Sequence, residues 1–169
     1  MTGVASCSRI QTVPHMTQYS TSHPTRKQKV LFLCTGNSCR SQMAEAVVNA
    51  RLGDAWQAVS AGTHPQGYVH PMAVRALQEI GIHHNGRSKS ADEFQDADLD
   101  LVVTVCDSAA EECPVWLGKG KRVHHSFVDP FKARGTDEEI LNAYRQVRDQ
   151  IALEIPKLLQ EYSRPGRET

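Results

Sequence analysis

The segment CTGNSCRS (34–41) combines the residue types that a nucleophile facing an oxyanion needs. It follows the apolar run VLFL (30–33) and precedes a helical pattern, so it is expected to curl into the N-terminus of a helix. Backbone N–H groups and the helix dipole at such a terminus attract an anion. Cys34 would lie at the focus of that field, which lowers the pKa of a thiol and favours the thiolate at neutral pH.

The remaining positions of this segment support the same chemistry. Gly36 and Asn37 tolerate the unusual backbone angles of a tight anion-binding loop. Arg40 can direct two N–H donors at a tetrahedral oxyanion, and Ser41 can donate a hydrogen bond to the Cys34 sulfur when it acts as a leaving group. The predicted oxyanion-binding loop is Thr35, Gly36, Asn37, Ser38 and Cys39. The alternative is a buried cysteine that ends a strand, beside an arginine on the surface.

A departing oxygen must be protonated, and FVDPF (127–131) offers Asp129 as the general acid. Pro130 holds Asp129 in an extended conformation, pointing away from any helix. A simple Asp-Pro turn is the alternative. The position after a strand and beside an oxyanion-binding loop favours the general acid.

Two further cysteines, Cys106 and Cys113, lie seven positions apart in VTVCDSAAEECPVW (103–116). This spacing is wider than the C-x-x-C of a metal knuckle or a thioredoxin-type redox pair. They could be buried small side chains, or zinc ligands completed by His124 and His125. Zinc is disfavoured because neighbouring residues of a strand face opposite sides of the sheet. The other histidines are expected in turns and on the surface: His64, His70, His83 and His84.

The composition favours one soluble domain with working thiols. The 19 basic and 19 acidic residues cancel, so we expect no nucleic-acid partner and no anionic membrane surface. No apolar stretch approaches the roughly 18 residues of a membrane-spanning helix. The five cysteines of the 169 residues are an odd number without a secretory signal, which favours reduced thiols in the cytoplasm.

The first 44 positions contain no acidic residue. We expect residues 1–28 to form a disordered tail, with no role for Cys7, and 163–169 to form a second tail. A transit peptide is also poor in acidic residues, but residues 1–28 contain few arginines and show no amphipathic stripe. The predicted domain is therefore 29–162.

Short apolar runs alternate with helical patterns along this domain. The expected strands are 30–33, 56–62, 99–105 and 121–128. The first expected helix is 41–52, with Met43, Val47 and Ala50 on one stripe, and the second is 70–81. Alternating strands and helices predict an α/β three-layer sandwich with parallel crossovers, whose ligands bind at the carboxyl ends of the strands.

The last helix has the clearest pattern. Thr136 and Glu139 form a capping box at its start. Apolar residues follow at spacings of three and four: Ile140, Tyr144, Val147, Ile151, Ile155 and Leu158. Pro156 is expected to kink this helix or to end it.

Several of these segments resemble the low-molecular-weight protein tyrosine phosphatase superfamily, and within it the thioredoxin-coupled arsenate reductases. The similarity runs over 29–162 and includes LCTGNSCRSQMAEA, VSAGT, HPMAVRAL, DLVVTVCDSAAEECP and DPFKARGTDEEI. The last two segments separate the reductases from ordinary phosphatases. The resemblance implies a three-layer α/β/α sandwich around a central parallel four-stranded sheet.

The resemblance also implies a function for each site residue. Cys34 attacks the arsenic of arsenate, and Asp129 protonates the departing oxygen. Cys106 then attacks the Cys34 sulfur, which releases arsenite, and Cys113 moves the disulfide to Cys106–Cys113. Thioredoxin is the expected external reductant, with a glutaredoxin or a small thiol as alternatives, and neither metal nor flavin is needed. Phosphate and sulfate would compete as oxyanions, and a monomer is expected.

Capping-box spacing in SAAE (108–111) predicts a short helix between the two cysteines of this second pair. A helix would hold Cys106 and Cys113 roughly 10 Å apart. Because a disulfide needs α-carbons within about 7 Å, segment 107–114 should unwind when the bond forms.

Some relatives bind potassium beside the loop, and the candidate cation site here is Asn37, Glu45 and Ser60. The further Thr and Asp positions of those relatives are Ser88 and Ser90 in this chain. Loss of that carboxylate argues against a potassium requirement, and Lys89 is the alternative source of positive charge.

Two other functions share the same loop. A phosphatase would use Cys34, Arg40 and Asp129 alone, and Phe127 and Phe131 beside the acid favour weak activity on aryl phosphates. A redox-sensing or oxyanion-binding module would use the thiols without turnover. Cys39 does not discriminate between these functions and has no assigned role. A protective Cys34–Cys39 disulfide under oxidation is the alternative.

Overall fold

The computed structural model of the chain describes residues 26–106 and 116–163. Most of both predicted tails, together with Cys7, lies outside the described residues. The same holds for the predicted helix between Cys106 and Cys113, and for Cys113 itself.

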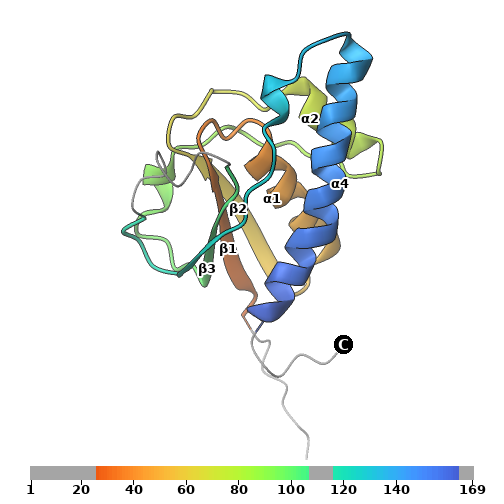
Figure 1. Cartoon of the computed structure of the whole chain (residues 1–169). Coiled ribbons are helices and arrows are strands. Elements are labelled where there is room, and N and C mark those ends of the chain that lie inside the picture. Colours follow the sequence, from red (N-terminus) through yellow and green to blue (C-terminus); the bar gives the residue numbers. More distant parts are fainter. Residues whose placement is uncertain (1–25, 107–115, 164–169) are drawn as a thin grey trace, which may run out of the picture.

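The centre of the domain is a sheet of parallel strands in the order β2-β1-β3-β4 (Figure 1). Its strands are β1 (Gln28–Cys34), β2 (Trp56–Gly62), β3 (Leu101–Thr104) and β4 (Lys121–His124). The strongly apolar runs became the central pair β1 and β3, as parallel strands covered on both faces require. The weaker run became the edge strand β4, which is shorter than the 121–128 expected and largely exposed.

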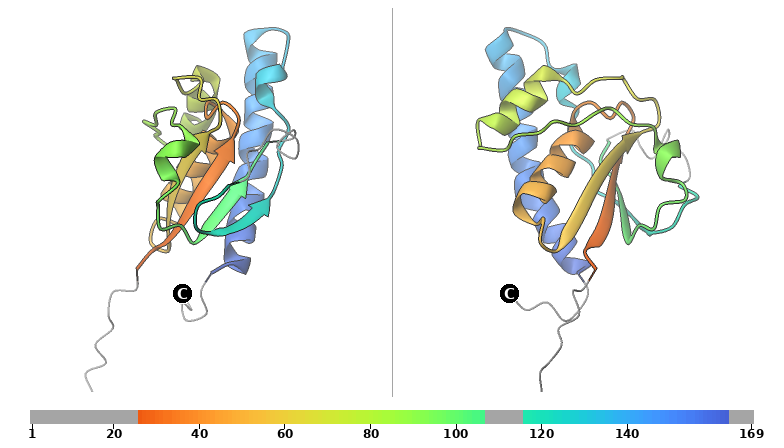
Figure 2. Two further views of the ribbon diagram at one scale, coloured as in Figure 1. Left: turned by 90° about the vertical axis from the view of Figure 1, so that its left-hand side faces the viewer. Right: turned by 180° about the vertical axis from the view of Figure 1, so that it is seen from behind.

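The α-helices of the described part lie together on one face of this sheet. They are α1 (Arg40–Arg51), α2 (Pro71–Gln78) and α4 (Asp137–Glu161). The short helix η1 (Ala91–Phe94) lies on the opposite face (Figure 2, left). A second short helix, η2 (Pro130–Lys132), follows Asp129. The predicted layered α/β fold around a four-stranded parallel sheet is confirmed.

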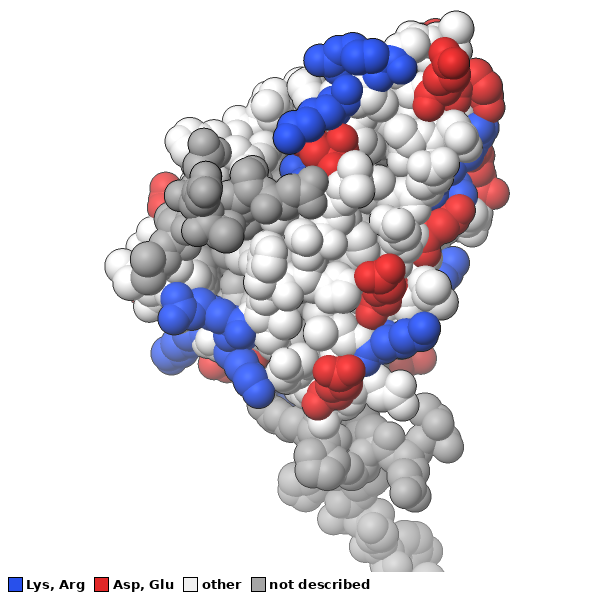
Figure 3. All heavy atoms as spheres, viewed as in Figure 1, with Lys and Arg blue, Asp and Glu red and all other residues white. Residues whose placement is uncertain are grey.

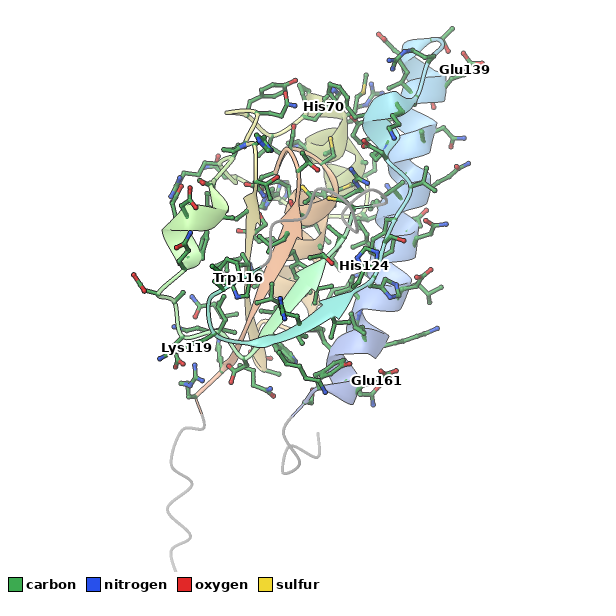
Figure 4. All side chains as sticks on the ribbon, turned by 60° about the vertical axis from the view of Figure 1, so that its left-hand side comes forward. His70, Trp116, Lys119, His124, Glu139 and Glu161 are labelled. Atoms are coloured by element: carbon green, nitrogen blue, oxygen red, sulfur yellow. The ribbon has the colours of Figure 1, made fainter. Side chains whose placement is uncertain are left out.

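Alternation along β1 divides the core between the two faces. Val30 and Phe32 pack toward the α-helices, in the same cluster as Met43 of α1 and Ile151 of α4. On the other face, Leu31 and Leu33 belong to a smaller cluster with Leu99, Val102 and Trp116. The Trp116 indole N–H donates to the Lys119 carbonyl at 3.0 Å, and both residues are labelled in Figure 4.

The capping box predicted for α4 is present. The Thr136 hydroxyl accepts from the Glu139 N–H, and the Glu139 carboxylate accepts from the Thr136 N–H at 2.8 Å. Glu139 and Glu161 mark the two ends of this helix in Figure 4. Two apolar positions of the buried face were missed, Leu141 and Leu159.

Of the two effects expected of Pro156, a kink or the end of the helix, the second is wrong, because α4 continues to Glu161. A proline at position 156 leaves the carbonyl of Ala152 without its helical donor. The Arg51 guanidinium of α1 donates to that carbonyl at 3.3 Å. A neighbouring helix thus supplies the hydrogen bond that Pro156 cannot. On α1, Met43 and Val47 are buried as predicted, but Ala50 is exposed.

None of the helices that the structure describes combines the length and the apolar character of a membrane-spanning segment. Basic and acidic side chains both occur on the face seen in Figure 3, and neither sign covers it alone. On this face, the described residues present no uniform positive charge to attract an anion.

We predict that Ile151→Ala lowers the free energy of unfolding by about 2–5 kcal/mol, because it removes a fully buried side chain and leaves a cavity. Leu153→Ala on the same helix, where the side chain is 59% exposed, should change it by less than about 0.5 kcal/mol. Urea denaturation of both variants measures the difference. Equal losses would mean that α4 packs through another face.

Candidate active site

The predicted oxyanion-binding loop joins the end of β1 to the start of α1 at Arg40. Asn37 at its centre has a φ of 44°, the left-handed region, and is the only non-glycine residue of the described part with a positive φ. Its side-chain amide donates to the hydroxyls of Ser41 and Ser60, both at 2.9 Å. The Oδ1 of the same side-chain amide accepts from the Lys89 N–H at 2.7 Å. Asn37 therefore adopts the left-handed conformation that the sequence analysis expected it to tolerate.

Two glycines at the loop, Gly36 and Gly62, allow neighbouring parts of the chain to approach closely. Gly36 does not have a positive φ, so the predicted reason for a glycine there is wrong. A Cβ on Gly36 would lie 2.9 Å from the Gln66 Cγ. A Cβ on Gly62, at the end of β2, would lie 2.5 Å from the Thr35 carbonyl oxygen. The sequence analysis treated Gly62 only as the end of a strand.

Cys34 is 4% exposed and surrounded by donors. Its Sγ lies 2.9 Å from the Ser41 Oγ and accepts a hydrogen bond from the Asn37 N–H at 3.1 Å. The Cys106 thiol has the largest effect on Cys34, followed by the Ser41 hydroxyl and the backbone donors of Ser41 and Asn37. Against the opposing effect of burial, they lower the pKa of Cys34 from 9.0 to about 6. Cys34 is accordingly a thiolate at neutral pH.

Cys106 lies just beyond β3 and faces the same loop. Its Sγ accepts a hydrogen bond from the Thr35 N–H at 3.1 Å. Its hydrogen bond to the Cys34 sulfur, burial and the Cys34 charge all raise the pKa of Cys106. Of the two sulfurs, Cys34 therefore gives up its proton and Cys106 keeps it. Neither sulfur is in a disulfide.

Arg40 and Asp129 face the loop together. Arg40 Nη2 lies 3.3 Å from the Asp129 Oδ2, and Nη1 donates to the Phe127 carbonyl at 3.1 Å. Asp129 Oδ1 accepts from the Phe131 N–H at 3.2 Å, so this residue also caps the turn after Pro130. Asp129 therefore caps the Asp-Pro turn and also lines the pocket that contains Cys34, so the two alternatives weighed for it do not exclude each other.

A pocket of about 250 Å³ opens over Cys34. Its lining is Cys34, Thr35, Gly36, Ser38, Cys39, Arg40, Gln66, Asp129, Phe131 and Lys132. Gln66 and Lys132 were missed by sequence reasoning, and only the nearness of Lys132 to the Asp-Pro pair pointed to it. Of the two phenylalanines expected beside Asp129, Phe131 is 47% exposed and lines the pocket, whereas Phe127 is buried.

The three residues of the candidate cation site lie together behind the loop. Asn37 donates to Ser60, and the Ser60 hydroxyl donates to the Glu45 carboxylate. The Lys89 ammonium lies 3.1 Å from the Glu45 Oε2, with only 10% of its side chain exposed. The charge of Glu45 is thus neutralised by a cation from the chain itself. The Ser88 hydroxyl donates to the Gly36 carbonyl of the loop at 3.2 Å.

Cys39 has no role as a thiolate in this geometry. Burial raises its pKa to about 11, and its sulfur lies 3.4 Å from the Tyr144 hydroxyl. His70, labelled in Figure 4, stacks on Tyr144 with ring centroids 4.9 Å apart and accepts from the Met72 N–H at the start of α2. His70 therefore has a structural role.

The two histidines weighed as zinc ligands have other partners. His124 Nδ1 lies 2.7 Å from the Thr104 hydroxyl, and His125 Nε2 lies 2.7 Å from the Glu154 carboxylate. Within 26–106 and 116–163, no three His, Cys, Asp or Glu side chains are grouped to hold a metal ion.

A buried thiolate between a parallel strand and a helix, faced by an arginine and an aspartate, defines a phosphatase-type oxyanion site on an α/β domain. The family model described as low molecular weight phosphotyrosine protein phosphatase matches residues 29–167. The chain belongs to this family.

Known proteins similar to this chain include both reductases and phosphatases. An arsenate reductase of Halalkalibacterium halodurans is 48% identical over 130 residues, which are 76% of this chain and 93% of that protein. A solved arsenate reductase from Archaeoglobus fulgidus has a TM-score of 0.65 and 34% identity, covering 78% of this chain and 98% of that one. A solved low molecular weight protein tyrosine phosphatase from T. tengcongensis has a TM-score of 0.63 and 30% identity, covering 80% and 99%. The fold alone does not choose between the two activities.

We predict that the rate of alkylation of Cys34 by iodoacetamide rises with pH around a midpoint near 6, since only the thiolate reacts and its fraction grows as the pH passes the pKa. Ser41→Ala and Cys106→Ala should each move the midpoint upward, because each removes a donor to the sulfur. Mass spectrometry of the Cys34 peptide measures the rate, and Cys39 in the same sample is the unreactive control. A wild-type midpoint near 9 would contradict the buried thiolate.

Proposed function

We propose that this protein is an arsenate reductase, which converts arsenate to arsenite through a relay of three thiols. The relatives named arsenate reductase support this proposal. The observation that carries it is the Cys106 thiol beside the Cys34 thiolate, with the Cys106 sulfur held at the loop by the Thr35 N–H. Hydrolysis of a phosphate ester uses Cys34, Arg40 and Asp129, and it does not require attack by the Cys106 sulfur.

The first step forms a bond between sulfur and arsenic. Arsenate enters the pocket, where the loop N–H groups and the Arg40 guanidinium bind its oxygens. The Cys34 thiolate attacks arsenic, and Asp129 gives a proton to the oxygen that leaves as water. Arg40 already contacts Asp129, so the acid and the oxyanion-binding cation are placed together before substrate arrives.

The second step transfers the electrons. Cys106 attacks the Cys34 sulfur, and its proton passes to an oxygen of the departing arsenite. A Cys34–Cys106 disulfide forms, and the sulfur–arsenic bond breaks with its electron pair going to arsenic. Arsenic(V) thereby becomes arsenic(III) and leaves as arsenite. The Cys34 charge that raises the pKa of Cys106 is gone once Cys34 is bonded to arsenic, while the Arg40 charge that lowers it remains.

The relay is completed by Cys113, which attacks Cys106 and leaves a Cys106–Cys113 disulfide with Cys34 free again. A dithiol protein of the thioredoxin type then reduces this disulfide. The proposal includes a monomeric enzyme in the cytoplasm, where thiols are kept reduced. Phosphate and sulfate compete for the loop as tetrahedral oxyanions.

We predict that the reduced protein consumes NADPH with thioredoxin, thioredoxin reductase and arsenate, and that Cys106→Ser and Cys113→Ser each abolish this flux. Both variants should still release phosphate from an aryl phosphate, because that reaction uses Cys34, Arg40 and Asp129 and no attack by Cys106 or Cys113. Replacing thioredoxin by glutaredoxin or by a small thiol identifies the reductant. Brisk cleavage of aryl phosphate without any arsenate-dependent flux would reject the reductase.

A second activity is favoured by one observation. Phe131 is half exposed at the rim of the pocket, where it can contact the ring of an aryl phosphate. We infer a weak phosphatase side activity that uses Cys34, Arg40 and Asp129.

The proposal excludes a potassium requirement, since the Lys89 ammonium neutralises Glu45. Wild-type activity should be the same in sodium and in potassium salts. Lys89→Met should destabilise the protein by about 3–5 kcal/mol, because Glu45 is left as an unpaired, mostly buried charge. Added potassium should restore part of this loss in thermal melts. Arg87→Met, an exposed position on the same segment, is the control. A wild-type enzyme that needs potassium would contradict the proposal.

A further inference from the structure

Segment 84–89 lies against the oxyanion-binding loop on the side away from the pocket. The Ser88 hydroxyl donates to the Gly36 carbonyl at 3.2 Å, and the Lys89 N–H donates to the Asn37 side chain at 2.7 Å. No residue of 84–89 lines the pocket over Cys34. The segment therefore contacts the loop on the side opposite the pocket, and it can act on a bound substrate only through the loop.

Gln42 connects this segment to the loop. Its side chain is fully buried. Its Nε2 lies within hydrogen-bond distance of acceptors only: the Asn37 Oδ1 at 2.9 Å, the Asn37 carbonyl at 3.3 Å and the Arg87 carbonyl at 2.8 Å. The amide cannot be reversed, because reversal would set its oxygen against these three oxygens.

The other end of the Gln42 amide then requires a donor, and His84 provides it. His84 Nε2 lies 2.6 Å from the Gln42 Oε1. Since Oε1 can only accept, the hydrogen is on His84 Nε2. Burial lowers the pKa of His84, which favours the neutral ring with this nitrogen protonated.

The chain leaves no free space at this hydrogen bond. A Cβ on Gly86 would lie 2.3 Å from both the Gln42 Oε1 and the His84 Nε2. Gly86 is not among the residues with positive φ, so its lack of a side chain serves the close approach and not an unusual backbone angle.

We propose that His84 and Gln42 are positioning residues for the nucleophile. Their hydrogen bond fixes the Gln42 amide, and the amide holds Asn37 in its left-handed conformation. Asn37 in turn aims its N–H at Cys34 and its side-chain amide at Ser41. Neither His84 nor Gln42 contacts the Cys34 sulfur. The inference rests on Cys34 as the nucleophile and holds for arsenate and phosphate esters alike.

The test compares His84→Leu with His83→Leu, the same substitution at the exposed neighbouring histidine. Two quantities are measured on the reduced full chain: the pH midpoint of Cys34 alkylation and the Kd for inorganic phosphate. We expect His84→Leu to raise the midpoint by about one unit and the Kd about tenfold, the effect of one lost hydrogen bond in a buried network. His84→Gln, which keeps an N–H donor, should restore much of both, and His83→Leu should change neither.

A lower melting temperature of His84→Leu with unchanged midpoint and Kd would overturn the proposal, because the residue would then be merely structural. If His84→Leu does not fold, Gly86→Ala takes its place, since it forces the pair apart without removing either partner. The same shifts are expected for it, and their absence would be equally decisive. Because neither measurement uses arsenate, failure here is distinguishable from failure of the proposed reductase activity.

Discussion

Burying a negatively charged sulfur is costly unless its surroundings donate hydrogen bonds to it, and much of this structure follows from that requirement. Cys34 is almost fully buried, and its donors come from the Asn37 backbone, the Ser41 hydroxyl and the Cys106 thiol. The first two depend on the loop conformation, which turns on Asn37 in the left-handed region. The hydrogen bonds of Asn37 in turn reach into β2, α1 and segment 84–89. A change in any of these elements therefore alters the hydrogen bonds to the Cys34 sulfur.

The sheet decides which residues meet. β1 pairs in parallel with β3, with Leu33 opposite Thr104, so the residues after each strand leave the same edge. Cys34 ends one strand and Cys106 follows the other by two positions, which brings sulfurs 72 positions apart in sequence to one loop. Asp129 follows β4 in the sequence and lies at this same edge of the sheet. The register of these strands therefore sets the distance over which the two thiols interact.

Local patterns predicted most of the fold and the residues at the pocket. β2 has the bounds that its apolar run and terminal glycine indicated, and the capping box of α4 formed as its spacing required. The loop was also predictable, because its residues are consecutive. Pairings between distant segments were not. Nothing near Pro156 indicates that Arg51 replaces its missing hydrogen bond, and nothing near His84 indicates Gln42 as its partner. Such pairs exist only once the helices and the sheet are packed.

One proton shared between two sulfurs gives the proposed reaction its order. While Cys34 is a thiolate, its hydrogen bond and its charge keep Cys106 protonated, and a protonated thiol is a poor nucleophile. A disulfide between the two sulfurs also needs a two-electron acceptor, and in the proposed reaction arsenic(V) bonded to Cys34 is that acceptor. Bonding of Cys34 to arsenic removes that charge and leaves Arg40 as the nearby cation. The first bond to substrate thus activates the second nucleophile. The hydrogen bonds that favour the Cys34 thiolate therefore do two things: they prepare the first attack and they delay the second.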